Sequence, residues 1–403
     1  MSEAAMQSTQ RLVIVGGGMV GASLALALQG YARERQWELV LVEAFAPTSE
    51  FQPSYDARST ALSYGSRLIF ERLGVWAAMA ERAEPIRQIH VSDRGRFGAA
   101  RLNAEEEHVP ALGYVVENAW LGHCLLNALD TEVVQWRCPA QVTALTAQPS
   151  GYQLTLKEDG DDSVLHADLL VLADGGRSGL REQLGIGVRH TPYGQSALIA
   201  NLTPAQPHQG QAFERFTDNG PMALLPVADN RCALVWTRPE EDAERLRTLD
   251  DRSLLAELQD AFGYRLGAIK QIGTRHIYPL ALTEAEEQVR PHLVVLGNAA
   301  HSLHPIAGQG FNLSLRDTMA LAGELLASET ALGALAPLTA FHARQSRDQW
   351  LTIGFSDRVT RLFSNNDPLL SLGRGLGLVG LDVVPLAKHW FARQAMGLGV
   401  KHV

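Results

Sequence analysis

The feature that most constrains this chain is a glycine-rich turn near its start, between two apolar segments. The segment Arg11–Val15 is short and β-branched, as in a buried strand, and residues 19–29 carry alanine and leucine at helical spacing. Between them, Gly16, Gly18 and Gly21 form the pattern G-x-G-x-x-G. The first glycine permits a tight turn, the second lets backbone approach a pyrophosphate, and the third lets helix and strand pack closely. The sequence therefore predicts a dinucleotide-binding turn.

An acidic residue completes this pattern. Residues 38–42 form a second apolar strand, and Glu43 follows it at the roughly 20-residue offset where a carboxylate binds ribose hydroxyls. The diphosphate is expected at the N-terminus of the first helix, where free N–H groups and the helix dipole favour negative charge. A glycine turn without a ligand is the alternative interpretation. Strand, helix and carboxylate together favour the dinucleotide, although they do not distinguish NAD from FAD.

Later segments extend this unit. Residues 167–173 and 292–296 are apolar runs typical of buried parallel strands, and the second precedes a glycine-rich turn and a helical pattern over residues 311–326. Between residues 196 and 237, short β-prone runs separated by turn residues predict an inserted antiparallel sheet that binds substrate. Helical character dominates from about residue 338, with breaks at Asn365–Pro368 and Pro385.

Together these patterns predict an α/β fold: a Rossmann-like, discontinuous dinucleotide-binding domain with an inserted antiparallel β-sheet domain and C-terminal helices. The dinucleotide-binding domain is expected over residues 11–88, 108–185 and 270–345, the substrate-binding sheet over 89–107 and 186–269, and the helical region over 346–403.

Composition excludes several classes of protein. With 403 residues, 46% of them hydrophobic and 20% charged, the chain is expected to be globular. A formal charge of -9 argues against nucleic-acid binding, which requires clustered cations. Three widely spaced cysteines predict neither a disulfide framework nor a zinc site, and no apolar run is long enough to span a membrane. A cytoplasmic protein is expected, with its first ten residues as a loose tail.

Two further motifs identify the dinucleotide. One is Ala173-Asp174-Gly175-Gly176-Arg177-Ser178-Gly179-Leu180-Arg181, and the other runs from Gly297-Asn298-Ala299-Ala300-His301 to His304-Pro305-Ile306-Ala307-Gly308-Gln309-Gly310-Phe311-Asn312. With the N-terminal glycines, they resemble the three-motif signature of the single-component FAD-dependent aromatic hydroxylases. The resemblance extends from Arg11 to about residue 345, and it implies FAD as the cofactor.

The resemblance implies roles for particular residues. Asp174 and Gly175 would mark a turn beside FAD and the approach path of the pyridine nucleotide, Gly297 and Asn298 would contact ribitol and pyrophosphate, and residues 308–310 would present N–H groups to the flavin. The full set of cofactor-binding residues implied is Gly16, Gly18, Gly21, Glu43, Arg58, Asn118, Asp174, Gly175, Gly297, Asn298, Gly308, Gln309, Gly310, Phe311 and Asn312.

Asn298 departs from the aspartate usual in the family, and this change is typical of the subgroup that hydroxylates polyprenylated phenols in ubiquinone biosynthesis. The segments Asp56–Leu62, His90–Gly95, Gly220–Pro226 and Arg361–Asn365 point to the same subgroup. The resemblance implies 2-octaprenyl-6-methoxyphenol as substrate, converted to the corresponding benzoquinol. NAD(P)H would be the transient electron donor and O2 the co-substrate, and oxygen would be transferred from a flavin C4a-hydroperoxide.

Several residues have alternative interpretations. His301 and His304 have no third ligand at a usable spacing, so no metal site is expected, and His301 is interpreted as structural. The catalytic residues are unknown; the candidates near the flavin are Arg58, which is otherwise a solvated surface charge, and the rigid turn His304-Pro305. Trp236 and Phe216 fit core packing as well as substrate contact.

Three rival functions remain: a sister ring hydroxylase of the same pathway, a FAD-dependent isoprenoid reductase, and a non-catalytic subunit of a quinone-synthesis complex. The resemblance also leaves open assembly into a multi-enzyme complex, a homo-oligomer, and peripheral membrane contact. For the last, the apolar segment Leu369–Val384 is the candidate, with a buried helix face as the alternative.

Overall fold

The computed structural model describes residues 9–46, 58–305, 308–363 and 368–399. Its α-helices are α1 Met19–Arg35, α2 Tyr64–Arg72, α3 Trp76–Ala80, α4 Asn118–Asn127, α5 Leu180–Gln183, α6 Glu240–Thr248, α7 Asp251–Phe262, α8 Gln309–Ala327, α9 Leu335–Phe363, α10 Pro368–Val383 and α11 Pro385–Ala395. Helix α10 ends just before Pro385, as the sequence predicts; the other predicted break falls mostly on residues 364–367, outside the described residues.

The predicted parallel sheet is present. Its strands are β1 Arg11–Val15, β2 Glu38–Val42, β8 Val134–Arg137, β12 Leu169–Leu172, β19 Val289–Arg290 and β20 Leu293–Val295. They are ordered β19-β20-β12-β1-β2-β8, with only β19 antiparallel to its neighbour. Their apolar side chains point alternately to the two faces, and this explains why the runs read as continuously hydrophobic.

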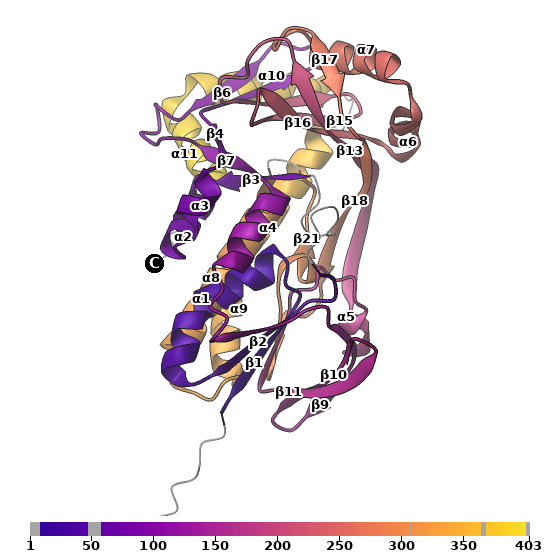
Figure 1. The fold of residues 1–403 in the computed structure, drawn as a ribbon. Coiled ribbons are helices and arrows are strands. Elements are labelled where there is room, and N and C mark those ends of the chain that lie inside the picture. Colours follow the sequence, from indigo (N-terminus) through magenta and orange to yellow (C-terminus); the bar gives the residue numbers. More distant parts are fainter. Residues whose placement is uncertain (1–8, 47–57, 306–307, 364–367, 400–403) are drawn as a thin grey trace, which may run out of the picture.

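The two faces of this sheet are covered differently. Helices α1, α8 and α9 pack on one face, around Ile14, Leu28 and Leu321 (Figure 1). An antiparallel sheet packs on the other, around Leu154 and Leu172, with strands β9 Gln141–Gln148, β10 Gly151–Glu158 and β11 Asp161–Ala167. The sequence does not predict this small sheet, because β9 is mostly exposed and β11 begins with three polar residues, so neither strand forms a continuous apolar run.

The predicted inserted sheet is larger than expected. Its strands are β5 Gln88–Asp93, β6 Ala99–Asn103, β13 Val188–Pro204, β14 Gln211–Thr217, β15 Gly220–Val227, β16 Arg231–Pro239, β17 Ile269–Ile272, β18 His276–Ala285 and β21 His301–Ser302. All pairs are antiparallel except β14 with β5. Helices α6 and α7 cover the outer face, around Trp236 and Phe262 (Figure 1). These two helices do not cover the inner face of the sheet.

A third group of elements consists of a small sheet and the helices that pack beside it. Strands β3 Ser59–Ser63, β4 Glu84–Ile86 and β7 Gly113–Glu117 form a small antiparallel sheet. Beside it, α2 to α4 pack against α1 and α8, and α11 packs on Leu102 and Leu112. Helix α10 lies against β6, where the Arg101 N–H donates to Asp382 at 2.8 Å. The domain boundaries expected from the sequence stay a prediction.

Two glycines of α1 allow a matched test of the close packing in the first turn. A Cβ atom at Gly21 would overlap the Gly16 carbonyl oxygen, whereas one at Gly30 would have no neighbour within 4 Å. Gly21→Ala should therefore destabilise the protein by about 1 to 3 kcal/mol, from overpacking, and weaken dinucleotide binding. Gly30→Ala should stabilise it by about 0.5 to 1 kcal/mol, from helix propensity. Thermal unfolding of both variants measures this, and equal effects at the two positions would contradict it.

Candidate functional site

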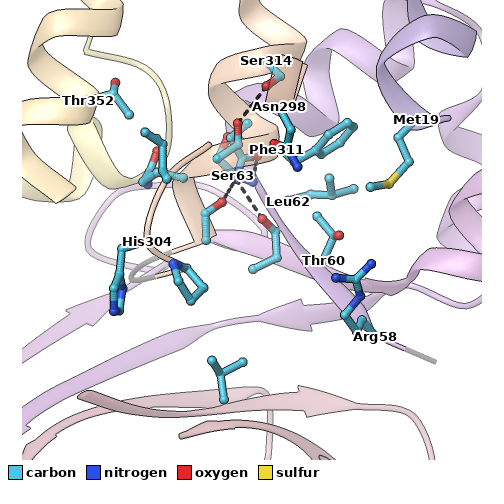
Figure 2. Close-up of a pocket in the computed structure, with 18 of the residues that line it drawn as sticks. Met19, Arg58, Thr60, Leu62, Ser63, Asn298, His304, Phe311, Ser314 and Thr352 are labelled. Atoms are coloured by element: carbon cyan, nitrogen blue, oxygen red, sulfur yellow. Dashed lines mark hydrogen bonds between the residues drawn. The ribbon is translucent and has the colours of Figure 1, made fainter. Parts of the chain in front are cut away.

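One large cavity lies where the three groups of elements meet. Its volume is about 1450 Å³, which exceeds the roughly 300–1,000 Å³ of a typical ligand pocket. Its wall includes the ends of β1 and β2, strand β3, the start of α8, the inner face of the large sheet, and residues of α9, α10 and α11. Figure 2 shows side chains from separate segments, including Arg58, Asn298 and His304, around this space.

The predicted glycine turn forms one end of the cavity. Gly18 is the N-cap of α1 and makes no side-chain hydrogen bond, so the first N–H groups of the helix lack a capping side chain. Glu43 lies directly beside this turn, and its carboxylate accepts hydrogen bonds from the Gly17 N–H at 2.8 Å and the Phe45 N–H at 3.0 Å. The arrangement presents a helix N-terminus and an acidic side chain to the same space, as an adenosine diphosphate requires.

The second motif forms a turn that its own aspartate holds in place. Asp174 follows β12 and accepts hydrogen bonds from the Gly176 N–H at 3.0 Å, the Ser178 N–H at 3.3 Å and the Ser178 hydroxyl. Gly175 and Gly176 both have positive φ, which favours glycine. Asp174 and Gly175 line the cavity, and the Asp174 carboxylate shapes the turn.

The third motif opens a second helix onto the cavity. Gly308 has φ +60° and is the N-cap of α8, again without a side-chain hydrogen bond. The Asn312 amide, in the first turn, donates to the carbonyls of Ala61 and Gly308, while its oxygen accepts from the Ser63 N–H and the Ser66 hydroxyl. All its hydrogen-bonding capacity is thereby used within the protein, so the side chain fixes α8 against β3.

The histidines of this segment have separate environments. His301 is buried and bonds Asp317 at 2.6 Å, and Asp317 also accepts from Gln345 at 2.8 Å, so the structural interpretation is confirmed. His304 and Pro305 line the cavity. Burial lowers the pKa of His304 to about 4, so this imidazole is neutral near pH 7.

Arg58 and Asn118 lie on neighbouring strand ends. Both line the cavity, and the Asn118 N–H donates to the Arg58 carbonyl at 2.9 Å. The Arg58 guanidinium lies 4.7 Å from the ring centre of Tyr278, and the Asn118 oxygen accepts from the Thr60 hydroxyl at 2.6 Å. The predicted pair therefore shares one wall of the site.

Most of the predicted site residues are brought together at this cavity. Those that line it are Gly16, Gly18, Glu43, Arg58, Asn118, Asp174, Gly175, Asn298, His304, Pro305, Gly308, Gln309, Gly310, Phe311 and Asn312. Gly21 and Gly297 do not: Gly21 is buried against the Gly16 carbonyl, and a Cβ at Gly297 would lie 3.1 Å from Val20. These two glycines shape the wall through packing.

The two aromatic residues considered for substrate contact lie on opposite faces of the large sheet. Phe216 is on its inner face and lines the cavity, whereas Trp236 is on the outer face, in the core with α6 and α7.

Sequence reasoning missed one ionisable residue of the inner face. Glu214 lines the cavity, and burial raises the pKa of its carboxyl from 4.5 to about 8. The sequence of β14, QAFERFT, has no regular polar–apolar alternation, so only strand pairing places Glu214 on the inner face with Ala212 and Phe216.

Comparison with known proteins identifies the family. Residues 9–355 match the model of the family described as "FAD binding domain". The chain belongs to this family. Ubiquinone hydroxylase UbiL of Rhodospirillum rubrum is 35% identical over 96% of this chain and 89% of its own length. The 3-demethoxyubiquinol 3-hydroxylase of Escherichia coli is 32% identical over 96% and 98%, and the human mitochondrial ubiquinone biosynthesis monooxygenase COQ6 is 27% identical over 96% and 92%.

Solved structures share the fold. That of p-nitrophenol 4-monooxygenase PnpA from Pseudomonas putida DLL-E4 has a TM-score of 0.79 at 16% identity, covering 99% of this chain and 100% of its own. PqsL of P. aeruginosa, in complex with 2-aminobenzoylacetate, has a TM-score of 0.74 at 23% identity, covering 91% and 99%. The predicted family and its aromatic hydroxylase fold are confirmed.

The residues at the cavity fit FAD. Two uncapped helix N-termini and an acidic side chain at a strand end face one space, and glycines at Gly16 and Gly308 allow backbone to approach a ligand. Among the described residues, no group of three or more His, Cys, Asp or Glu side chains is arranged to hold a metal. No described helix is both long and apolar enough to cross a bilayer.

The Glu214 carboxyl makes stability depend on pH in a predictable direction. In the unfolded chain Glu214 releases its proton near pH 4.5, whereas in the folded protein it retains the proton to about pH 8, so the wild type loses stability as pH rises across this range. Glu214→Gln cannot ionise, so its stability relative to the wild type should rise by up to about 1.4 kcal/mol per pH unit. Melting temperatures at about pH 5 and about pH 8 measure this. Glu241→Gln, at an exposed position, is the control and should show no such trend. If the difference in melting temperature between Glu214→Gln and the wild type were the same at both pH values, the prediction would be wrong.

Proposed function

We propose that this protein is a FAD-dependent, NAD(P)H-consuming monooxygenase that hydroxylates the ring of a polyprenylated phenol. The substrate proposed is 2-octaprenyl-6-methoxyphenol, which would become the corresponding benzoquinol. One observation carries the proposal: a single cavity joins a dinucleotide cradle at one end to an apolar chamber beneath the C-terminal helices at the other. The names of relatives at 27–35% identity support the ubiquinone pathway.

The two ends of the cavity suit the two molecules. The cradle, at the N-termini of α1 and α8, would hold FAD through Gly16, Gly18, Glu43 and the backbone of residues 308–312. The chamber has apolar walls from the large sheet and from α9 to α11, including Ile89, Leu225, Phe355, Leu378 and Phe391. An isoprenoid tail is stabilised by such surface, at about 25 cal/mol per Å² buried. The ring would lie between the two ends.

The protein's own groups support this chemistry by position and charge. FAD, when bound, would pass electrons from NAD(P)H to dioxygen and supply the oxygen atom that enters the ring. The N-terminus of α8 places partial positive charge at the wall of the cavity, where it would stabilise a negative charge on a bound ring system. His304, neutral near pH 7, adds no competing charge, and the apolar walls exclude water.

A sister ring hydroxylase is the second candidate, favoured by the 32% identity to the 3-demethoxyubiquinol 3-hydroxylase. The two candidates differ in the ring carbon that receives oxygen. The isoprenoid reductase and the non-catalytic subunit differ from both, because neither would insert oxygen.

Turnover with defined substrates tests the proposal. The purified protein should bind FAD, and NADPH should reduce the flavin faster when a 6-methoxyphenol with a prenyl group at position 2 is present. In air the product should gain one oxygen atom from O2, as ¹⁸O labelling and mass spectrometry would show. Demethoxyubiquinol as substrate distinguishes the sister hydroxylase. Reduction without oxygen insertion would point to the reductase, and FAD that NADPH does not reduce would point to the non-catalytic subunit.

We also propose that the mouth of the chamber contacts a membrane surface. Trp350, Leu351, Phe355 and Trp390 line the cavity and are also exposed, at 64%, 41%, 39% and 62%. Leu386, on α11, is 84% exposed. A polyprenylated substrate is held in the bilayer by its tail, so an apolar mouth at the membrane would let it enter without crossing water. The segment suggested by the sequence, Leu369–Val384, corresponds to α10 and lies between α9 and α11 in the chain.

Binding to phospholipid vesicles tests this surface. The double substitution Leu386→Ser and Trp390→Ser should weaken co-sedimentation with vesicles of neutral and anionic lipid by about tenfold or more, because each inserted apolar side chain contributes about 1.5 to 3 kcal/mol. Tyr264→Ser is the control, since Tyr264 is 74% exposed in the loop after α7. Equal vesicle binding by both variants would refute the membrane contact.

A further inference from the structure

A lone carboxyl lies in the apolar inner face of the large sheet. Glu214 of β14 is paired with Ala223 of β15 and Val91 of β5. The row continues from Ala223 to Val235, then to Ile199, and from Val91 to Ala100. Side chains directly opposite one another on paired strands share a face. Glu214 is therefore the ionisable member of a row whose other residues are Ile199, Val235, Ala223, Val91 and Ala100.

The orientation of Glu214 follows from its neighbours on the same strand. Phe213 packs against Phe262 on the outer face, at 5.2 Å between ring centres, and Arg215 donates to the Ala261 carbonyl at 2.9 Å on that face. Because successive side chains alternate, Glu214 points inward, where it lines the cavity with Phe216.

This carboxyl has no structural task in the described part of the protein. No described side chain forms an ion pair with it or donates a hydrogen bond to it, and burial is the cause that raises its pKa to about 8. Glu214 is half-buried among apolar side chains at the cavity wall. A carboxyl shielded from water without a partner costs stability, so residues of this kind mark sites where a ligand supplies the missing contact.

The other ionisable groups that line the cavity lie on elements other than the large sheet. Arg58 precedes β3 and stacks on Tyr278, His304 is held neutral by burial, and on α9 Asp348 pairs with Arg316 at 2.6 Å while Arg358 lies near Trp350. Glu43, Asp174 and Arg177 belong to the dinucleotide end. On the inner face of the sheet, Glu214 is thus the group available to a polar atom of the substrate ring.

Resting on the proposed function, we infer that Glu214 binds the ring hydroxyl of the phenolic substrate and accepts its proton. In this step the oxygen–hydrogen bond of the phenol breaks, and a new one forms on the Glu214 carboxylate. The electron pair left on the phenolate oxygen is shared with the ring carbons and makes them more nucleophilic toward the incoming oxygen atom. The proton then passes from Glu214 to solvent water. A general base is most effective when its pKa lies near the pH at which the enzyme operates.

The test compares Glu214→Gln, Glu214→Asp and the exposed control Glu241→Gln in the FAD-loaded protein. Hydroxylation of the 2-prenyl-6-methoxyphenol by Glu214→Gln should fall by roughly 10²-fold or more, with FAD content and binding unchanged. Glu214→Asp, which keeps the carboxylate, should recover part of the rate. In the wild type kcat/KM should rise with pH through about pH 8, and this limb should vanish in Glu214→Gln. An unchanged rate and pH profile in Glu214→Gln would overturn the inference.

A binding measurement separates this inference from the proposed function. Nitrophenol, a chromophoric phenol, should bind to the wild type as the phenolate, detected by difference absorbance, and should bind Glu214→Gln more weakly and in its neutral form. A wild type that hydroxylates no phenol would end the proposed function, while the nitrophenol result would still decide the role of Glu214. Equal affinity and equal ionisation in both proteins would show that Glu214 does not contact the hydroxyl.

Discussion

The close contact between the first turn of α1 and the end of β1 is the constraint on which the site depends. Because Gly21 has no side chain, the helix approaches the Gly16 carbonyl, and its N-terminus comes to lie at the carboxyl end of the parallel sheet. Glu43 and the turn at Asp174 follow the neighbouring strands β2 and β12, so they reach the same edge. This backbone contact therefore fixes the α1 side of the dinucleotide cradle.

The second helix at the cavity is held by buried polar groups. Asn312 ties its first turn to β3 and α2, His301 and Gln345 both bond Asp317 in its middle, and Arg316 pairs with Asp348 of α9. Such buried hydrogen bonds specify position, since breaking one leaves a buried polar group unpaired at a cost of about 1–3 kcal/mol. Packing alone would allow α8 to slide, whereas these bonds fix the helix N-terminus at the cavity.

The two faces of the large sheet have different roles. Its outer face is closed by α6 and α7 and stabilises the fold, as the burial of Trp236 and Phe262 shows. Its inner face is left open to the cavity and supplies both the apolar surface and the carboxyl of Glu214. Because side chains alternate along each strand, Arg215 bonds α7 on the outer face while its neighbour Glu214 lines the cavity on the inner face.

The sequence by itself determined the family, the strands and helices of the dinucleotide-binding unit, and most of the residues that line its end of the cavity. These features depend on local patterns: glycines at fixed spacing, continuous apolar strands and turn residues. Tertiary structure alone decided which face of each strand meets the cavity, and so it separated Phe216 from Trp236 and revealed Glu214. It also showed that Gly21, Gly297 and the Asn312 amide act through packing and internal hydrogen bonds. The physical reason is that a side chain's environment is set by strand pairing and by contacts between residues far apart in the chain, such as Asn312 with Ser63, which no local pattern records.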